Sequence, residues 1–110
     1  MDSDEFDARL ARLLEALDET VSLLLRHGSY HWAASLDVSR WLISNGDRSG
    51  LDHLLSGFGG MGSLNDLVLH PLNGSASENR SAEVDDDILD GLRHRLFTEA
   101  TALRGALDRP

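Results

Sequence analysis

The sequence predicts an all-α fold, a small single-domain helical bundle of three longer amphipathic helices plus a short helix, with a glycine-rich loop before the last helix. Apolar residues recur at steps of three and four over most of the chain, which is typical of helices that bury one face. Four glycines fall within residues 57–62, and such a run indicates a tight connection. A length of 110 residues suits one core, so we expect residues 1–110 to form a single helical domain.

The first predicted helix runs from Asp4 to about His27. Carboxylates cluster in its first turn and Arg26 lies in its last, as the helix dipole favours. Gly28 follows as the expected C-terminal cap. The apolar residues that define its buried face are Phe6, Leu10, Leu13, Leu14, Leu17, Val21, Leu24 and Leu25.

The second predicted helix follows Ser29, whose side chain we expect to cap it, and ends at Asn45-Gly46. It carries both tryptophans of the chain, Trp32 and Trp41. Because an indole buries a large apolar area, we expect both in the core, with their N–H groups hydrogen-bonded near its edge.

Two further helices complete the prediction. Ser49 and Asp52 form a capping-box variant that starts a short third helix leading into the glycine loop. We expect residues 71–82 to form a mobile polar loop, and a last helix to run from about Glu83 to Leu107 with Asp85-Asp86-Asp87 at its solvated start. The residues expected on its apolar side are Val84, Ile88, Leu89, Leu92, Leu96, Phe97, Ala100, Leu103 and Leu107.

The composition excludes several kinds of chemistry. All ten basic residues are arginines, so a P-loop lysine and Schiff-base mechanisms are absent, and the lack of cysteine excludes thiol chemistry. The formal net charge of -9 disfavours nucleic-acid binding and favours a basic protein partner. The acidic start of the chain and the lack of a long apolar run predict a cytoplasmic protein that does not enter membranes.

The glycine loop is the candidate binding site. Residues 57–62 match the G-x-G-x-x-G pattern, but they follow a helix rather than a strand, so we reject a dinucleotide site. Ser63 and Asp66 have capping-box spacing, which predicts a short helical turn, and Asn65 with Asp66 would form a polar tip on a rigid support. The binding residues that we predict are Gly59, Gly60, Met61, Gly62, Ser63, Asn65, Asp66 and Trp32.

The sequence assigns no metal, cofactor or catalytic residue. His27 and His31 have the four-residue spacing of a helical metal pair, but Gly28 lies between them and no third ligand is evident. Ser63 lacks the context of a nucleophile elbow, and no carboxylate pair is marked as buried. The remaining histidines, expected at the surface or at caps, are His53, His70 and His94. The sequence therefore favours a non-enzymatic protein.

The chain also resembles a small bacterial family of unknown function. The likeness rests on Trp32 and on the run from Phe58 to Leu67, which reads Phe-Gly-Gly-Met-Gly-Ser-x-Asn-Asp-Leu, and it extends to Asn73 and to Leu92-Arg93. The resemblance implies no particular activity. By analogy with other small acidic bacterial proteins, it suggests an immunity or antitoxin role.

Three functions follow as hypotheses. The leading one is a non-enzymatic protein-binding module, an immunity or antitoxin-type inhibitor of a basic partner protein. The alternative is a small-molecule-binding protein or hydrolase with a pocket under the glycine loop, walled by Trp32 and Trp41. The third is a structural homodimer that pairs apolar surface left over on the first and last helices.

Overall fold

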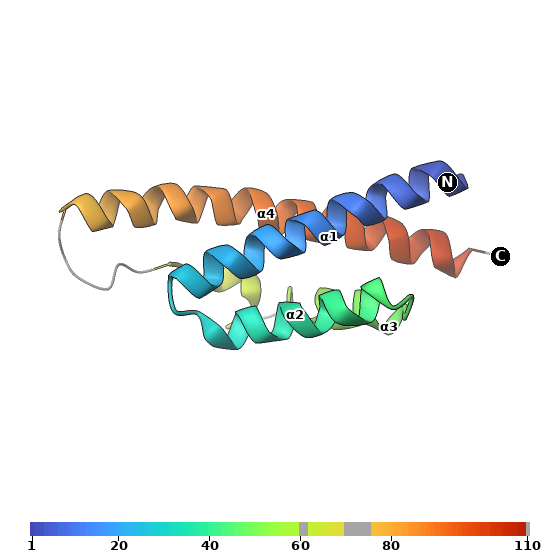
Figure 1. Cartoon of the computed structure of the whole chain (residues 1–110), viewed down its shortest axis with the longest axis horizontal. Helices are drawn as coiled ribbons and strands as arrows, with labels where there is room; N and C mark the ends of the chain where they lie inside the picture. The colour runs from blue at the N-terminus through green and yellow to red at the C-terminus, as the bar shows by residue number, and fades with distance from the viewer. Residues whose placement is uncertain (60–61, 70–75, 110) are drawn as a thin grey trace.

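The computed structural model describes residues 1–59, 62–69 and 76–109 (Figure 1). Every regular element in these ranges is helical, which confirms the all-α prediction. The elements are α1 (Ser3–Arg26), α2 (Tyr30–Ser44), α3 (Ser49–Ser56), the 3-10 turn η1 (Leu64–Asp66) and α4 (Ala76–Asp108). Within these ranges, no helix combines the length and the apolar character needed to cross a bilayer.

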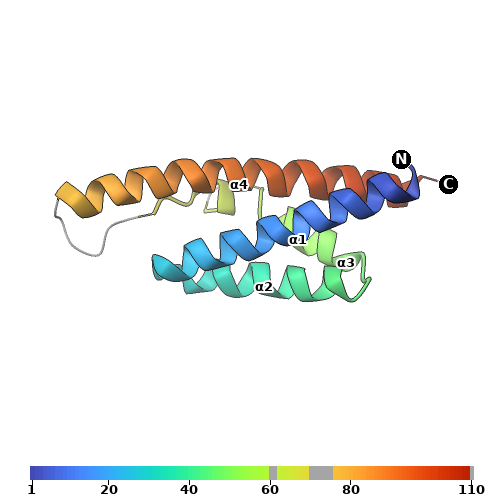
Figure 2. The ribbon, with the colours of Figure 1, turned by 45° about the horizontal axis from the view of Figure 1, so that its top comes forward.

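The helices form an elongated four-cornered bundle measuring 54 × 23 × 22 Å. α1 packs against α2 and α4, and α3 packs against the same two helices from the other side. Figures 1 and 2 both show α1 and α4 running side by side in opposite directions, with α2 and α3 along one side of the pair. Leucines supply most of the core, and those without exposed surface are Leu13, Leu17, Leu24, Leu64, Leu89, Leu96 and Leu103.

One corner of the bundle is only partly helical. α3 has eight residues, whereas α4 has 33, so α3 covers only part of the length of its neighbour. Beyond it, η1 and the extended segment 67–69 continue along the bundle and place Leu64 and Leu69 in the core. The glycine loop therefore lets irregular backbone occupy a position that a longer helix would otherwise fill.

Two glycines end helices as expected. Gly28 has a φ of 73°, and the amide of Ser29 donates to the Leu24 carbonyl oxygen at 2.9 Å. Gly46 has a φ of 77° and follows α2 in the same way. Both arrangements are Schellman motifs, which place glycine where other residues would be strained. They turn the chain sharply between α1, α2 and α3.

The N-terminal caps differ from the prediction. Ser29 precedes α2, but its side chain makes no capping hydrogen bond. α3 begins at Ser49 after the N-cap residue Arg48, whose side chain makes no capping bond, and Asp47 Oδ1 instead accepts from the Ser49 amide at 2.9 Å. Hydrogen bonds from the side chain and the backbone of Ser49 stabilise the carboxylate and lower the pKa of Asp47 below its ordinary value.

The start and the apolar face of α4 also differ. The helix begins at Ala76, so residues 76–82 are helical rather than part of a polar loop, while residues 70–75 lie outside the described ranges. Residues 75–78 have the Ser-x-x-Glu pattern of a helix start. The prediction of a loop followed the polar composition of this segment instead. Four residues expected on the apolar side of α4 are exposed, because they lie on the flanks of its buried leucines or near its end: Val84, Ile88, Phe97 and Leu107.

Candidate functional site at the glycine loop

The glycine loop is closed by hydrogen bonds within itself. The Leu64 amide donates to the Gly57 carbonyl oxygen at 2.8 Å, so the chain turns back directly after α3. Gly62 has a φ of 74°, a conformation that favours glycine. Its amide donates to Asp66 Oδ2 at 2.8 Å. The predicted residues Gly60 and Met61 lie outside the described ranges, and Gly59 is exposed.

Asn65 and Asp66 are exposed, but they are not the free polar tip that we expected. Asn65 Nδ2 donates to the Phe58 carbonyl oxygen at 3.2 Å, and the Asp66 carboxylate accepts from Gly62. Ser63 precedes η1 as predicted, yet it is buried and its side chain makes no capping bond. These side chains therefore maintain the shape of the loop, and only their remaining atoms face solvent.

Arg93 of α4 holds the loop from the other side. Its Nη1 donates to the carbonyl oxygens of Leu64 at 2.8 Å, Asn65 at 3.2 Å and Leu67 at 2.8 Å. The side chain is 12% exposed and also pairs with Asp90. The guanidinium thereby supplies a donor to the Asn65 and Leu67 carbonyls and a second donor to the Leu64 carbonyl, which also accepts from the Leu67 amide at 3.3 Å. Arg93 is named in the sequence analysis only as part of the family resemblance. Its position between the core leucines Leu92 and Leu96 of one helix could have indicated a partly buried arginine that pairs with polar groups.

Trp32 forms one wall of a depression beside the loop. Its ring packs on Gly57, where an added Cβ would lie 3.2 Å from Cζ3. The depression has a volume of about 450 Å³, and its lining residues are Trp32, Gly62, Ser63, Asp66, Leu67 and Val68. Val68 is 54% exposed, whereas Leu69 beside it is buried. The structure thus brings four of the predicted residues, Trp32, Gly62, Ser63 and Asp66, to one concave surface.

Trp41 does not belong to this site, and its assignment to the core was wrong. It is 66% exposed and lies on the outer side of α2, away from the loop. Trp32 and Trp41 are nine residues apart, which is two and a half turns at about 3.6 residues per turn. The two indoles must therefore point to opposite sides of one helix. Trp32 is half-buried and packs against the core.

A second depression lies on the α4 side of the loop, with a volume of about 330 Å³. Phe58 and Phe97 form a tilted ring pair there, with centroids 5.5 Å apart. The residues around it are Phe58, Asn65, Asp90, Arg93, His94 and Phe97. Asn65 therefore faces a different surface from Asp66, and the loop separates the two.

The nearest arrangement to a catalytic pair is Ser39 with His53, which sequence reasoning missed. Ser39 Oγ lies 2.6 Å from His53 Nδ1, between α2 and α3. Ser39 has no exposed surface, so its hydroxyl cannot reach a substrate. The pair instead joins two helices by satisfying polar groups that packing would otherwise bury unpaired.

His27 is engaged by α4 rather than by His31. His27 Nε2 lies 2.7 Å from Asp85 Oδ2, and Arg26 lies on the same carboxylate. Asp86 accepts from the Leu69 amide at 2.7 Å. Asp85 and Asp86, which we expected at a solvated helix start, therefore lie within α4 and contact His27, Arg26 and the Leu69 amide. No group of three residues suited to hold a metal ion occurs in the described part of the chain.

The matched family spans α2, α3 and the loop. Residues 25–78 match a family model described as a domain of unknown function, DUF6966. The match agrees with the expected likeness to an uncharacterised family. It contains Trp32 and the glycine loop but not Arg93, so the DUF6966 segment is held by a residue outside it. No curated protein and no solved structure matches the chain.

Proposed function

We propose that the protein is a non-enzymatic binding module of the immunity or antitoxin type, which acts in the cytoplasm by docking on a basic partner protein. The loop depression formed by Trp32, Gly62, Ser63, Asp66, Leu67 and Val68 is its binding surface. The observation that carries the proposal is that the segment 62–67 beside this surface is held from both sides by hydrogen bonds.

A fixed loop favours binding for an energetic reason. Ordering a mobile segment at an interface costs free energy, and a surface already held in shape avoids that cost. The Asp66 bond to Gly62 and the three carbonyls held by Arg93 define the loop before any partner arrives. Trp32 and Val68 then supply apolar contact area, and Asp66 supplies a charge at the edge.

The surface charge favours a basic partner. The net charge is -9, and the exposed side of α1 carries carboxylates that make no ion pair with any described residue. Those carboxylates are Asp4, Asp7, Glu15 and Glu19. An acidic surface accelerates the approach of a basic protein and repels nucleic acid, and both effects weaken as salt screens the charges.

Val68→Glu tests the proposal in a tagged pull-down from the host at low salt. Val68 has an apolar side chain that is largely exposed, so the variant should fold while replacing apolar contact area in the loop depression with a carboxylate that a docking partner must desolvate. The matched control is Val84→Glu on α4, where the valine is 58% exposed. We expect one stoichiometric basic protein with wild type and Val84→Glu, lost from Val68→Glu and eluted by salt. Equal retention by both variants would remove the loop from the interface.

The same depression supports a second candidate, a small-molecule-binding protein. A volume of about 450 Å³ falls within the usual range for ligand pockets. One wall is the aromatic ring of Trp32, and a carboxylate of Asp66 lies at the edge. A thermal-shift screen of small cations and aromatic metabolites checks this candidate, and a hit that Val68→Glu abolishes without any protein partner would favour it.

A further inference from the structure

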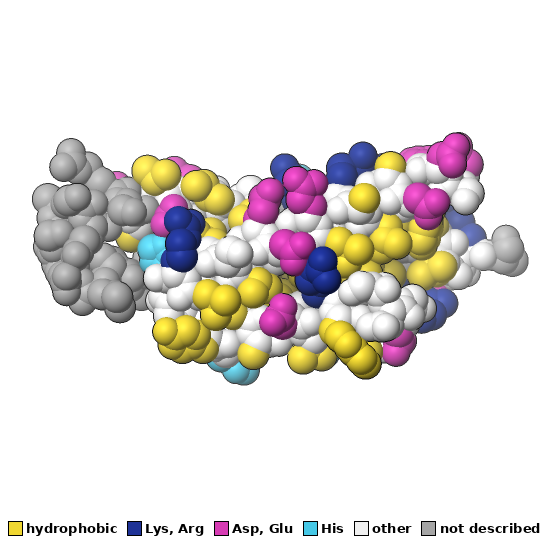
Figure 3. Space-filling view, in the orientation of Figure 1, with side chains coloured by type: hydrophobic (Ala, Val, Ile, Leu, Met, Phe, Trp, Pro, Cys, Tyr) yellow, Lys and Arg dark blue, Asp and Glu magenta, His cyan; other side chains and the backbone are white. Residues whose placement is uncertain are grey.

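The outer face of α2 carries an unusual row of apolar side chains. Tyr30, Ala34, Val38 and Trp41 follow one another at steps of four, four and three, so they share one side of the helix. All four are exposed, and Tyr30 at 67% and Trp41 at 66% are the most exposed large hydrophobic side chains of the described residues. Figure 3 shows apolar side chains along the edge formed by α2. We call these four residues the α2 outer face.

Acidic groups border the α2 outer face. Asp37 lies one turn before Trp41, is exposed, and makes no ion pair with any described residue. On the neighbouring α1, Glu15, Asp18 and Glu19 are exposed, and Figure 3 shows acidic side chains over α1 above the apolar row. The surface therefore combines a strip of apolar area with a negative margin on the α1 side.

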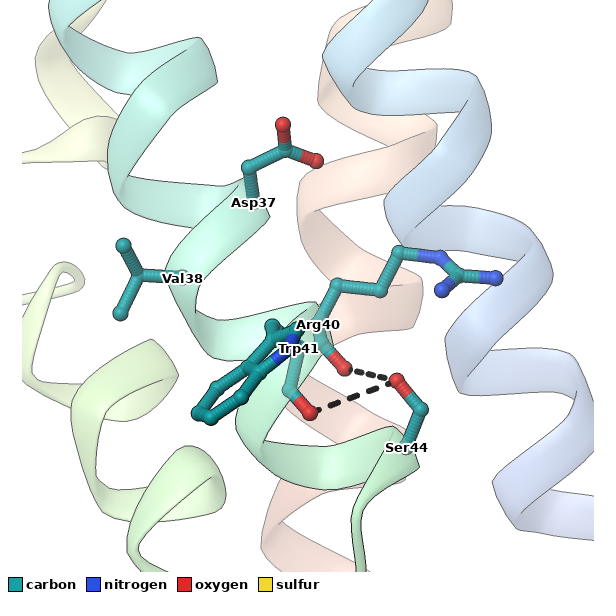
Figure 4. A pocket seen from close by; sticks show the side chains of 5 residues that line it. All are labelled: Asp37, Val38, Arg40, Trp41 and Ser44. Carbon is teal, nitrogen blue, oxygen red and sulfur yellow. Dashed lines mark hydrogen bonds between the residues drawn. The ribbon is translucent and has the colours of Figure 1, made fainter.

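The basic side chain next to Trp41 on α2 is turned away from it. Arg40 extends toward α1, where Nη2 donates to Asp18 Oδ2 at 3.1 Å, while Val38 and Trp41 project from the other side of α2 (Figure 4). Asp37, Arg40 and the ring of Trp41 border a shallow depression of about 400 Å³. A guanidinium or ammonium group placed there would meet a carboxylate and an aromatic face together, while the guanidinium of Arg40 stays paired with Asp18.

We propose that the α2 outer face docks a cationic amphipathic helix of a partner protein. The apolar side of that helix lies along Val38 and Trp41, and an arginine or lysine from it lies between Asp37 and the Trp41 ring. Tyr30 and Trp41 are eleven residues apart, which corresponds to roughly 16 Å at 1.5 Å per residue, so a partner helix of three turns matches the row. This inference rests on the proposed function only in that the partner is basic.

Charge argues for such a partner over a second copy of the chain. A second copy also has a net charge of -9. In a two-fold dimer through this face, the acidic margin of α1 and Asp37 would approach the same groups of an identical chain. Like charges placed opposite each other at an interface disfavour association, whereas a cationic helix neutralises them.

Titration calorimetry with a synthetic probe tests the inference. The probe is an 18-residue helical peptide of leucine and lysine with the lysines on one side, and a peptide with glutamine in place of each lysine is its control. The protein variants are Trp41→Ala, Asp37→Asn and the control Val84→Ala, which removes another exposed apolar side chain from α4. Because Trp41 and Val84 are exposed, all three variants should retain the wild-type melting temperature.

We expect Trp41→Ala to weaken binding of the lysine peptide about tenfold, as loss of an aromatic anchor does. Asp37→Asn should weaken it less and reduce its salt dependence, and Val84→Ala should leave it unchanged. Equal affinities for Trp41→Ala and Val84→Ala would overturn the inference, as would equal binding of the glutamine peptide. A wild-type dimer in light scattering that Trp41→Ala dissociates would also overturn it, by showing that a second copy covers the face.

The host pull-down separates this inference from the proposed function. Loss of the partner with Val68→Glu but not Trp41→Ala supports the loop depression and overturns the α2 face. Loss with Trp41→Ala but not Val68→Glu supports the α2 face and overturns the loop depression as the docking surface.

Discussion

Replacing Arg93 tests whether one side chain holds the glycine loop. In Arg93→Ala, the carbonyls of Asn65 and Leu67 lose this donor, whereas the Leu64 carbonyl keeps the longer 3.3 Å bond from the Leu67 amide. Asn65 is exposed, so water replaces the guanidinium at its carbonyl. The Leu67 carbonyl belongs to a half-buried residue, and a hydrogen bond to a charged group contributes about 1.5–3 kcal/mol. Counting this one bond, we expect a loss of about 2 kcal/mol in the free energy of unfolding.

A loss of that size is readily measured. Domain stability is typically about 5–15 kcal/mol, and for a chain of this length about 2 kcal/mol lowers the melting temperature by roughly 10 °C. Urea unfolding followed by circular dichroism gives the free energy. Arg93→Lys should recover only part of the loss, because a single ammonium must serve both the carbonyls and Asp90, which separate nitrogens of the guanidinium contact in wild type.

The matched control is Arg95→Ala, two residues along the same helix. Arg95 is exposed, so its removal should change the free energy of unfolding by less than about 0.5 kcal/mol. If Arg93→Ala and Arg95→Ala destabilise the protein equally, the reasoning that assigns the loop to Arg93 is refuted.

Three other expectations concern packing and pH. Gly50→Ala should lower the free energy of unfolding by about 1–3 kcal/mol, because a Cβ there would lie 2.7 Å from a side-chain atom of α2. Gly91→Ala has open space around the added Cβ and should stabilise α4 by about 0.5–1 kcal/mol. The same urea assay measures both changes. Trp32→Ala should lower the free energy of unfolding by about 2 kcal/mol, which is less than the loss expected for replacing a fully buried tryptophan. Trp41→Ala should leave the melting temperature unchanged, because Trp41 is exposed. Because the pKa of Asp47 is lowered in the folded protein, its carboxylate contributes fully to folding stability above the ordinary pKa of 3.8. That contribution is lost as the pH falls through the lowered pKa. In Asp47→Asn, melting temperatures measured across this range should therefore fall less with acidification than those of wild type.

Local patterns in the sequence predicted most of the fold. The three-and-four spacing of leucines defines α1, and the glycines at 28 and 46 mark helix ends, because both signals depend on residues close in the chain. The placement of Trp41 was also within reach of the sequence. Its nine-residue distance from Trp32 already places the two tryptophans on opposite sides of α2. Assigning both of them to the core overlooked this spacing.

The contacts that shape the candidate site were not predictable in this way. Arg93 lies 26 to 29 residues from the carbonyls it holds, and His27 lies 58 residues from Asp85. Spacing within one helix says which side a residue occupies, but not which group of another helix faces it. Asn65 and Asp66 were correctly placed on the loop, yet their side chains could bind the loop itself or a partner, and only the folded backbone distinguishes these outcomes.

The partly helical corner has a consequence for motion. Where α3 forms the corner, its backbone bonds belong to a regular helix, but farther along the corner depends on Arg93 and on the Asp86 bond to the Leu69 amide. Opening this part breaks fewer interactions than unfolding the bundle, so its amide hydrogens should exchange with solvent through local openings of lower free energy. A partner that selects the closed loop would suppress those openings. Slower exchange at Leu64 and Leu69, with unchanged exchange in α1, would then report occupation of the loop independently of global stability.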